Sequence, residues 1–423
     1  MSSFPVRSLG LQSWRQFGSQ GIELDLEAQT TIIAGSNGTG KTTIINVIAK
    51  SLGVNVLNFA SGIDAAGEYS ADSMHPNVGD QDKRKMIVDG INYSLAPNQE
   101  LVGHLQIGQS RCQLYTPASV GAEFALQTIG RVPSVGVAYL GGHRPPFRAA
   151  QVNSIPTTAP RAEEVLAEYR KKALSALADP SRHSPLLEMK QTLIMLSMFG
   201  PGNKYVSPNR EMQELYEGYS DLLRLALPAD FGFERLDIRL PHVTVRSRAG
   251  EHPIDSLSGG LSALFDAIWQ LHLLNQTDPG GVVLIDEPEN HLHPAAQREL
   301  LPSLNKAFPQ LQKIVVTHNP FVLSSVRDAR VYSLSIGDHG VEAEDIGAWD
   351  RTGSVDDVLL KTFGIDVPAA RWIEDELMNI QESLERLDAG DKKAMTAVVD
   401  RLQEIGMLDM ASRLIQRAQD PSR

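Results

Sequence analysis

The chain of 423 residues contains a single cysteine, Cys112, so it cannot form an internal disulfide and is suited to a reducing cytosol. No apolar run approaches the ~20 residues needed to span a bilayer. The N-terminus has no basic segment followed by an apolar one, so we expect no signal peptide. These absences predict a cytoplasmic protein without a membrane partner.

Positive charge is also not in excess. The 39 Lys and Arg residues stand against 51 Asp and Glu residues, which gives a net charge of -12. This balance argues against a broadly basic protein that coats nucleic acid, although a local basic groove would still allow DNA as a partner. With 42% hydrophobic and 21% charged residues, the composition is that of an ordinary globular protein.

The pattern of apolar and polar residues changes along the chain. Near the N-terminus, "GIELDLE" and "TTIIAG" have the pattern of strands. Short alternating runs from about 85 to 140, the last being "SVGVAYLG", predict an antiparallel meander. Helical spacing dominates from about 161 to 228. From about 233 to 336 strands alternate with helices, which is typical of a mostly parallel sheet.

We therefore predict four regions. They are an N-terminal lobe with the phosphate loop and meander (1–150), a helical insertion (151–230), a C-terminal lobe (231–345) and a helical tail (346–423).

A glycine-rich segment, "GSNGTGKTT", fits the pattern G-x-x-x-x-G-K-[ST] and lies between a predicted strand and a predicted helix. Its backbone N–H groups and the helix dipole are suited to phosphate oxygens. Lys41 would neutralise the β- and γ-phosphates, and Thr42 would ligate Mg²⁺. We expect ATP to be bound by nine residues: Gly35, Ser36, Asn37, Gly38, Thr39, Gly40, Lys41, Thr42 and Thr43. The alternative is a glycine turn that only joins a core strand to a helix.

"GVVLIDEPENHLHP" supplies two carboxylates at the end of a predicted buried strand. Ligands of α/β sheets bind at this edge. Asp286 is suited to the Mg²⁺ shell, directly or through water. Glu287 could polarise the water that attacks the γ-phosphate. Alternatively, both carboxylates only cap the next helix.

Three histidines follow in this part of the chain. His318 ends another apolar strand, "KIVVTH", and is expected to sense the γ-phosphate, the alternative being a structural histidine. His291 and His293 in "ENHLHP" lie beside a turn proline, and we do not expect a zinc site there.

A second glycine turn, "LSGG" (Leu257 to Gly260), precedes the helical segment "LSALFDAIWQLHLL". Together with the phosphate loop, "VVLIDEPENHLHP" and "VVTHNP", it occurs in the order and spacing of ABC-type ATPases. The chain resembles their soluble branch, which includes RecF, SMC proteins and the overcoming-lysogenization-defect (OLD) nucleases. The early "SWRQFG" segment is similar to the "nwr-x-F" segment of that branch.

This resemblance implies an α/β fold, an ABC-type P-loop ATPase head to which the meander, a short helical insertion and a helical C-terminal tail are added. It also implies ATP hydrolysis with Mg²⁺, and a homodimer or higher even-numbered oligomer that packs head to tail. Ser258, Gly259 and Gly260 would then bind the γ-phosphate held by the partner subunit. The alternative is that this turn is only a helix N-cap.

The chain also departs from transporter ATPases. Leu261 stands where they usually have Gln after the two glycines, and "AYLGGHRPPF" replaces a convincing Q-loop. That segment resembles one in OLD-like ATPases, in which case His143 or Arg144 would approach phosphate.

The C-terminal region lacks the acidic set of the Toprim domain that OLD nucleases carry. Its "SVDDVLLKTFGID" segment and helical pattern are similar to ATPase subunits of anti-phage systems such as Septu and related retron systems. In those systems a separate protein carries the nuclease or toxin. We therefore predict an ATPase that acts as the sensor or regulatory subunit of a defence complex. The alternatives are a RecF-like ATPase of DNA repair or recombination and, less favoured, the ATPase subunit of a membrane transporter.

Overall fold

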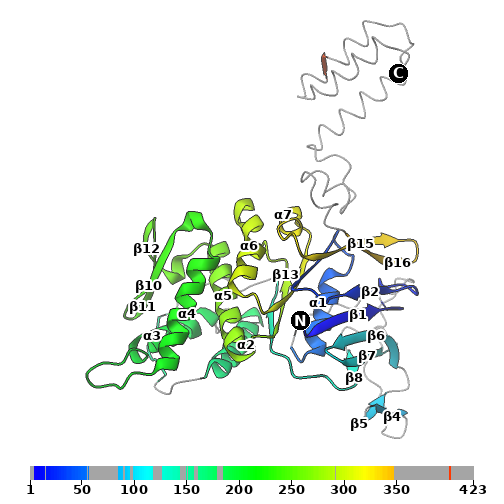
Figure 1. Cartoon of the computed structure of the whole chain (residues 1–423), viewed down its shortest axis with the longest axis horizontal. Helices are drawn as coiled ribbons and strands as arrows, with labels where there is room; N and C mark the ends of the chain where they lie inside the picture. Colours follow the sequence, from blue (N-terminus) through cyan, green and yellow to red (C-terminus); the bar gives the residue numbers. More distant parts are fainter. Residues whose placement is uncertain are drawn as a thin grey trace. The chain divides into compact units, whose positions relative to one another are not determined.

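The computed structural model describes residues 4–14, 16–54, 56, 84–88, 91–95, 99–117, 126–142, 149, 151–156, 161–178, 184–290, 292–346 and 400–401 (Figure 1). The chain divides into two compact units, residues 1–358 and 359–423. Among the described residues, no helix is long and apolar enough to cross a membrane.

The site is carried by a six-stranded sheet in the order β16-β15-β3-β14-β13-β9. All neighbours in it are parallel except β16, which pairs antiparallel with β15. Strands β3, β13 and β14 are buried at every position, as expected of central strands covered on both faces. The strands are β3 (Thr30–Gly35), β9 (Val137–Leu140), β13 (Val282–Asp286), β14 (Gln312–Thr317), β15 (Arg330–Gly337) and β16 (Gly340–Asp345).

A second, antiparallel sheet has the order β2-β1-β6-β7-β8. Its strands are β1 (Val6–Leu11), β2 (Ile22–Asp25), β6 (Gln99–Ile107), β7 (Ser110–Pro117) and β8 (Gln127–Ile129). One hydrophobic core joins this sheet, helix α1 (Lys41–Ser51) and the parallel sheet. The buried Gln312 side chain also links the sheets, because it accepts from the N–H of Val6 and donates to the carbonyls of Val6 and Leu26. Strands β4 (Arg84–Val88) and β5 (Ile91–Leu95) form a separate hairpin.

The helical region packs around the long helix α5 (Gly259–Thr277), which follows the glycine turn. Its helices are α2 (Ala162–Ala178), α3 (Pro185–Phe199) and α4 (Arg210–Ala226). At the centre, Tyr219 of α4 meets Trp269 of α5 edge to face, with ring centroids 4.9 Å apart. In Figure 1 these helices gather around α5, away from α1 and strands β1 and β2.

Two parts of the predicted topology are wrong. Strand β9, predicted as the end of the meander, instead joins the parallel sheet beside β13. The strands read as "ERLDIRL" and "VTVRS", β10 (Phe233–Arg239) and β11 (His242–Ser247), were expected in the parallel sheet. They form their own antiparallel sheet with β12 (Gly250–Pro253). Only two residues separate β10 from β11, which allows a hairpin but no parallel crossover.

The remaining described elements are two 3-10 turns and two helices that follow strands of the parallel sheet. They are the 3-10 turns η2 (Ala229–Phe231) and η3 (Ile254–Ser256) and the helices α6 (Pro294–Ala307) and α7 (Pro320–Leu323). Of the predicted tail, only Asp400 and Arg401 are described, and they are helical. The "SVDDVLLKTFGID" segment lies outside the described residues, and the four predicted region boundaries stay a prediction.

Candidate nucleotide-binding site

The glycine-rich loop leaves the end of β3 and enters α1 with two left-handed glycines, Gly38 (φ +88°) and Gly40 (φ +90°). A side chain at Gly40 would also collide with Gln16 and Phe17. Only glycine adopts this backbone without cost, so the loop's conformation explains its composition. The predicted strand–loop–helix context of a phosphate-binding loop is therefore present.

Lys41 lies on the loop's inner side, where its Nζ donates to the carbonyl oxygens of Gly35 (2.8 Å) and Ser36 (2.9 Å). Burial lowers the pKa of this ammonium, while the nearby Glu287, Asp286 and Glu289 act against the shift. Lys41 is thus a buried cation beside the loop, with three carboxylates near it.

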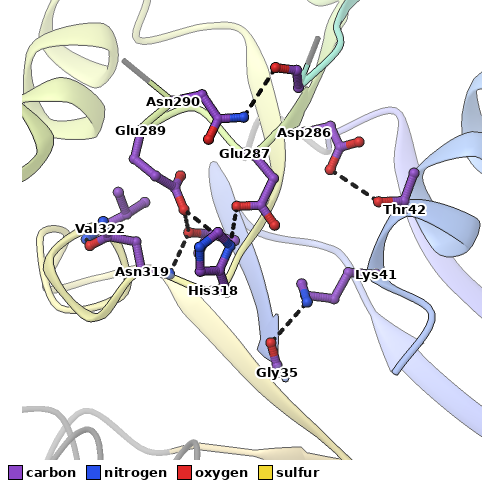
Figure 2. A network of polar contacts seen from close by, with 12 residues as sticks. Gly35, Lys41, Thr42, Asp286, Glu287, Glu289, Asn290, His318, Asn319 and Val322 are labelled. Atoms are coloured by element: carbon purple, nitrogen blue, oxygen red, sulfur yellow. Dashed lines mark hydrogen bonds and ion pairs between the residues drawn. The ribbon is translucent and has the colours of Figure 1, made fainter. Parts of the chain in front are cut away.

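Asp286 ends β13 and faces the loop. The Thr42 hydroxyl donates to its Oδ1 at 3.4 Å, so two hard oxygen ligands from distant parts of the chain meet at one point (Figure 2). Such oxygens are what Mg²⁺ prefers, and the pair fits the ion that accompanies a bound nucleoside triphosphate. Thr42 lies in α1, which follows β3, whereas Asp286 ends β13, and β14 lies between these two strands in the sheet.

Glu287 follows Asp286 with a positive φ of +46°. This conformation is strained for a residue with a long side chain, and observed strain of this kind clusters at functional sites. It is held by the Glu287 N–H, which donates to the carbonyl oxygen of Val316 at 2.9 Å. Burial raises the pKa of the Glu287 carboxyl.

His318 follows β14 and is half exposed, and its Nδ1 lies 2.5 Å from Oε2 of Glu287. Figure 2 shows the two side chains facing each other, with the Lys41 ammonium nearby. The structure thus brings together five predicted residues: Lys41 and Thr42, which were predicted from the glycine-rich motif, and Asp286, Glu287 and His318, which were predicted from strand ends. Their assigned roles stay predictions.

Sequence reasoning missed Glu289, which is almost completely buried behind Glu287 and His318. Its Oε1 accepts from the Thr317 hydroxyl at 2.5 Å and lies 3.9 Å from Nδ1 of His318. Burial raises the pKa of Glu289 to about 7, and the neighbouring Glu287 carboxyl adds to the shift. A second acidic residue two positions after Glu287 was the available signal.

The loop after β14 is fixed by its own side chains. The Thr317 hydroxyl accepts from the N–H of Asn319, and the Asn319 side chain caps α7 and donates to Gln297. Asn290 donates to the carbonyl oxygen of Gly142, the last described residue before the predicted phosphate-contacting segment. His143 and Arg144 lie outside the described residues. So does His291, whereas His293 caps α6.

Ser258 caps α5, where its hydroxyl oxygen accepts from the N–H of Leu261. Ser258 and Gly259 are exposed, while Gly260 is buried. The hydrogen bonds that the structure gives Ser258 remain within its own turn, and none joins it to the phosphate loop of the same chain. Ser258 is therefore a helix N-cap, and Ser258 and Gly259 remain accessible to solvent.

Comparison with known families places these residues in context. Residues 64–324 match the family described as "AAA domain, putative AbiEii toxin, Type IV TA system". The chain belongs to this family. Residues 8–83, which include the glycine-rich loop, match a second AAA-domain family.

Several relatives share long or short stretches with the chain. A retron Ec83 probable ATPase of Escherichia coli is 23% identical over 409 residues, which cover 78% of this chain and 72% of the relative. A retron Vc95 probable ATPase of Vibrio cholerae is 36% identical over 104 residues, covering 22% and 20% of the two chains. A Septu protein PtuA of Bacillus mycoides is 46% identical over 54 residues, covering 13% and 8%.

Solved SMC heads are also similar to the chain. The SMC head domain from Thermotoga maritima is 12% identical with a TM-score of 0.43, and the match covers 81% of this chain and 99% of that one. The predicted resemblance to ABC-type ATPases, and to those of Septu and retron systems, is confirmed by the family and its relatives. The predicted α/β class is confirmed by the parallel sheet that carries the loop and by the antiparallel sheets and helices around it.

Proposed function

We propose that the chain binds ATP with Mg²⁺ and hydrolyses it at the site built by β3, β13 and β14. The observation that carries this proposal is the convergence of Lys41, Thr42, Asp286, Glu287 and His318 at one edge of adjacent strands. Mg²⁺ held by Thr42 and Asp286 would neutralise charge on the phosphates. The nine residues from Gly35 to Thr43 would hold those phosphates through backbone N–H groups and Lys41.

In this proposal Glu287 accepts the proton of the attacking water. Its raised pKa makes the carboxylate a stronger base, while the charge of Lys41 favours the ionised form. His318 orients the Glu287 carboxylate through the 2.5 Å contact and is placed to sense the γ-phosphate from the next strand.

We further propose that two subunits pack head to tail, so that Ser258, Gly259 and Gly260 of one subunit close over the nucleotide of the other. The exposure of this turn, and its lack of a described hydrogen bond to its own phosphate loop, support a role in trans. The N-terminus of a 19-residue helix is a suitable partner for phosphate.

For its role in the cell, we propose that the chain is the sensor or regulatory subunit of a prokaryotic anti-phage defence complex. A separate protein would be the nuclease or toxin of that complex. The support is the similarity to retron probable ATPases and to the Septu protein PtuA.

The decisive experiment replaces Glu287 by Gln. Because only the transition state loses its base, ATP affinity should remain while turnover falls by about 10²- to 10⁴-fold. ATP should also trap a closed dimer, measured by light scattering. Glu299→Gln, an exposed carboxylate on α6, is the matched control and should behave like the wild type. Wild-type turnover in Glu287→Gln would contradict the proposal.

A further inference from the structure

The helical insertion and the glycine turn are connected by polar contacts that the ATP site does not explain. Helix α5 is hydrogen-bonded to two insertion helices along its length. Tyr169 of α2 donates to Asp266, and Tyr219 of α4 donates to the carbonyl oxygen of Phe265 at 3.0 Å. About two turns further along α5, Nε2 of His272 lies 2.8 Å from the carbonyl oxygen of Leu215 on α4. Helix α5 is therefore attached to the insertion helices α2 and α4 by hydrogen bonds.

The third insertion helix, α3, reaches the turn itself. Lys190 of α3 forms a bidentate ion pair with Asp255, with distances of 3.0 Å to Oδ1 and 2.7 Å to Oδ2. The Lys190 side chain is 1% exposed and that of Asp255 is 12% exposed. A lysine this deeply buried requires a compensating charge, since a buried unpaired ammonium is strongly unfavourable.

Asp255 lies three residues before Ser258, in the 3-10 turn η3. The first residue of this turn, Ile254, is fully buried. The turn is closed by the Leu257 N–H, which donates to the carbonyl oxygen of Ile254. The Ser262 hydroxyl then donates back to the carbonyl oxygen of Leu257. The chain from Asp255 to Ser258 therefore has little freedom to move independently of Lys190.

We propose that Lys190 is a positioning residue for the glycine turn, and that through its ion pair with Asp255 the insertion sets the position from which Ser258 closes on the partner's nucleotide. This inference rests on the proposed head-to-tail function. It assigns a role to the insertion: a ligand or protein that displaces α3 changes closure of the ATP site without touching the phosphate loop.

The variants exploit the asymmetry of the pair. Asp255→Asn removes the carboxylate that the buried ammonium contacts, whereas Lys190→Met leaves a carboxylate that is 12% exposed and can be hydrated. Asp255→Asn should therefore be the more destabilised protein in thermal unfolding. The double variant Lys190→Met/Asp255→Asn has no buried charge and should fold, so it carries the functional test.

The first measurement is hydrogen exchange of the isolated subunit without nucleotide. In the double variant, the amides of residues 257–262 should exchange at least about tenfold faster than in the wild type, because the turn has lost its anchor. The amides of residues 35–43 should be unchanged. Unchanged exchange at 257–262, or equally faster exchange in both segments, would overturn the positioning role.

The second measurement places the double variant Lys190→Met/Asp255→Asn in the Glu287→Gln background. It compares ATP affinity and ATP-dependent dimerisation with those of Glu287→Gln alone. The affinity of the single subunit should be unchanged, while dimerisation should weaken by about tenfold or more. Faster exchange at 257–262 with unchanged dimerisation would support the positioning role and overturn the head-to-tail function instead.

A matched control is available in the same insertion. Arg210 and Glu214 on α4 form an ion pair at 2.7 Å, but their side chains are 91% and 61% exposed. Exposed pairs of this kind contribute little to stability. Arg210→Met/Glu214→Gln should therefore leave exchange, dimerisation and thermal unfolding unchanged, and an effect as large as that of Lys190→Met/Asp255→Asn would overturn the specific role of Lys190.

Discussion

Glu287 shows how a single residue can combine strain and chemistry. Its left-handed backbone turns the side chain from the end of β13 toward His318 on the neighbouring strand. The sequence predicted that a carboxylate would leave the sheet here. It did not predict that a third group, Glu289, would lie behind both side chains, because burial behind a turn leaves no periodic signal.

Glu289 leads to a prediction about pH. Its pKa is raised to about 7 in the folded protein, against about 4.3 for an unperturbed glutamate, so between these values the folded state binds the extra proton. The stability that this protonation provides is complete below about pH 4 and is lost as the pH rises through about 7. Glu289→Gln mimics the protonated carboxyl at every pH. It should therefore be more stable than the wild type at pH 8, by about 4 kcal/mol at most, and this gain should be much smaller at pH 5.

The measurement is the difference in thermal midpoint between Glu289→Gln and the wild type at several pH values, with Glu299→Gln as the exposed control. A difference that stays constant from pH 5 to pH 8 would show that Glu289 does not carry the proton.

At the scale of elements, local signals predicted the site better than the surrounding sheets. The strand–loop–helix around Lys41 could be predicted because the loop needs left-handed glycines and the strand is apolar throughout. Strand β9 could not be predicted in this sheet, because it pairs with β13, which lies 145 positions away in the register that joins Val137 to Val282. No local pattern carries that distance. The β10–β11 hairpin could have been predicted from its two-residue connection.

Helix α5 allows the cap function of Ser258 to be separated from a phosphate contact. Asp and Asn cap helices about as well as Ser, so Ser258→Asp and Ser258→Asn should both keep the thermal stability of the wild type. Only Asp places a negative charge where the γ-phosphate of the partner must approach. Ser258→Asp should therefore abolish ATP-dependent dimerisation and turnover, while Ser258→Asn retains most of both. Equal activity of the two variants would mean that the turn is only a cap.

At the scale of the whole molecule, the two candidate halves of an ATP site belong to different parts of the chain. The phosphate loop joins β3 to α1, which both contribute to the core shared by the two large sheets. The segments on either side of the glycine turn are instead bound to the helical insertion, through Asp255 and through Phe265. A sequence can show both motifs, but it cannot show whether they meet within one chain or between two subunits. The resemblance to ABC-type ATPases supplied that expectation, and a dimer of this chain is the assembly that would satisfy it.

Mixing two inactive subunits tests this assembly directly. Lys41→Ala removes the ammonium beside the phosphates and should weaken ATP affinity itself, measured by calorimetry, whereas Ser258→Asp should bind ATP normally as a single subunit. In a mixed dimer, one site carries both defects and the other is assembled from an intact loop and an intact turn. Because neither variant should form ATP-dependent dimers with itself, the dimers that form are mixed and contain one intact site each. Turnover should then return to at most about half of the wild-type value if the sites act independently. Strict cooperativity between the two sites could mask the return of turnover. Light scattering on the same mixture provides a second readout, because ATP-dependent dimers should form even where hydrolysis requires both sites. A mixture that shows neither turnover nor dimers would contradict a composite site, and the turn would then have to act within its own chain.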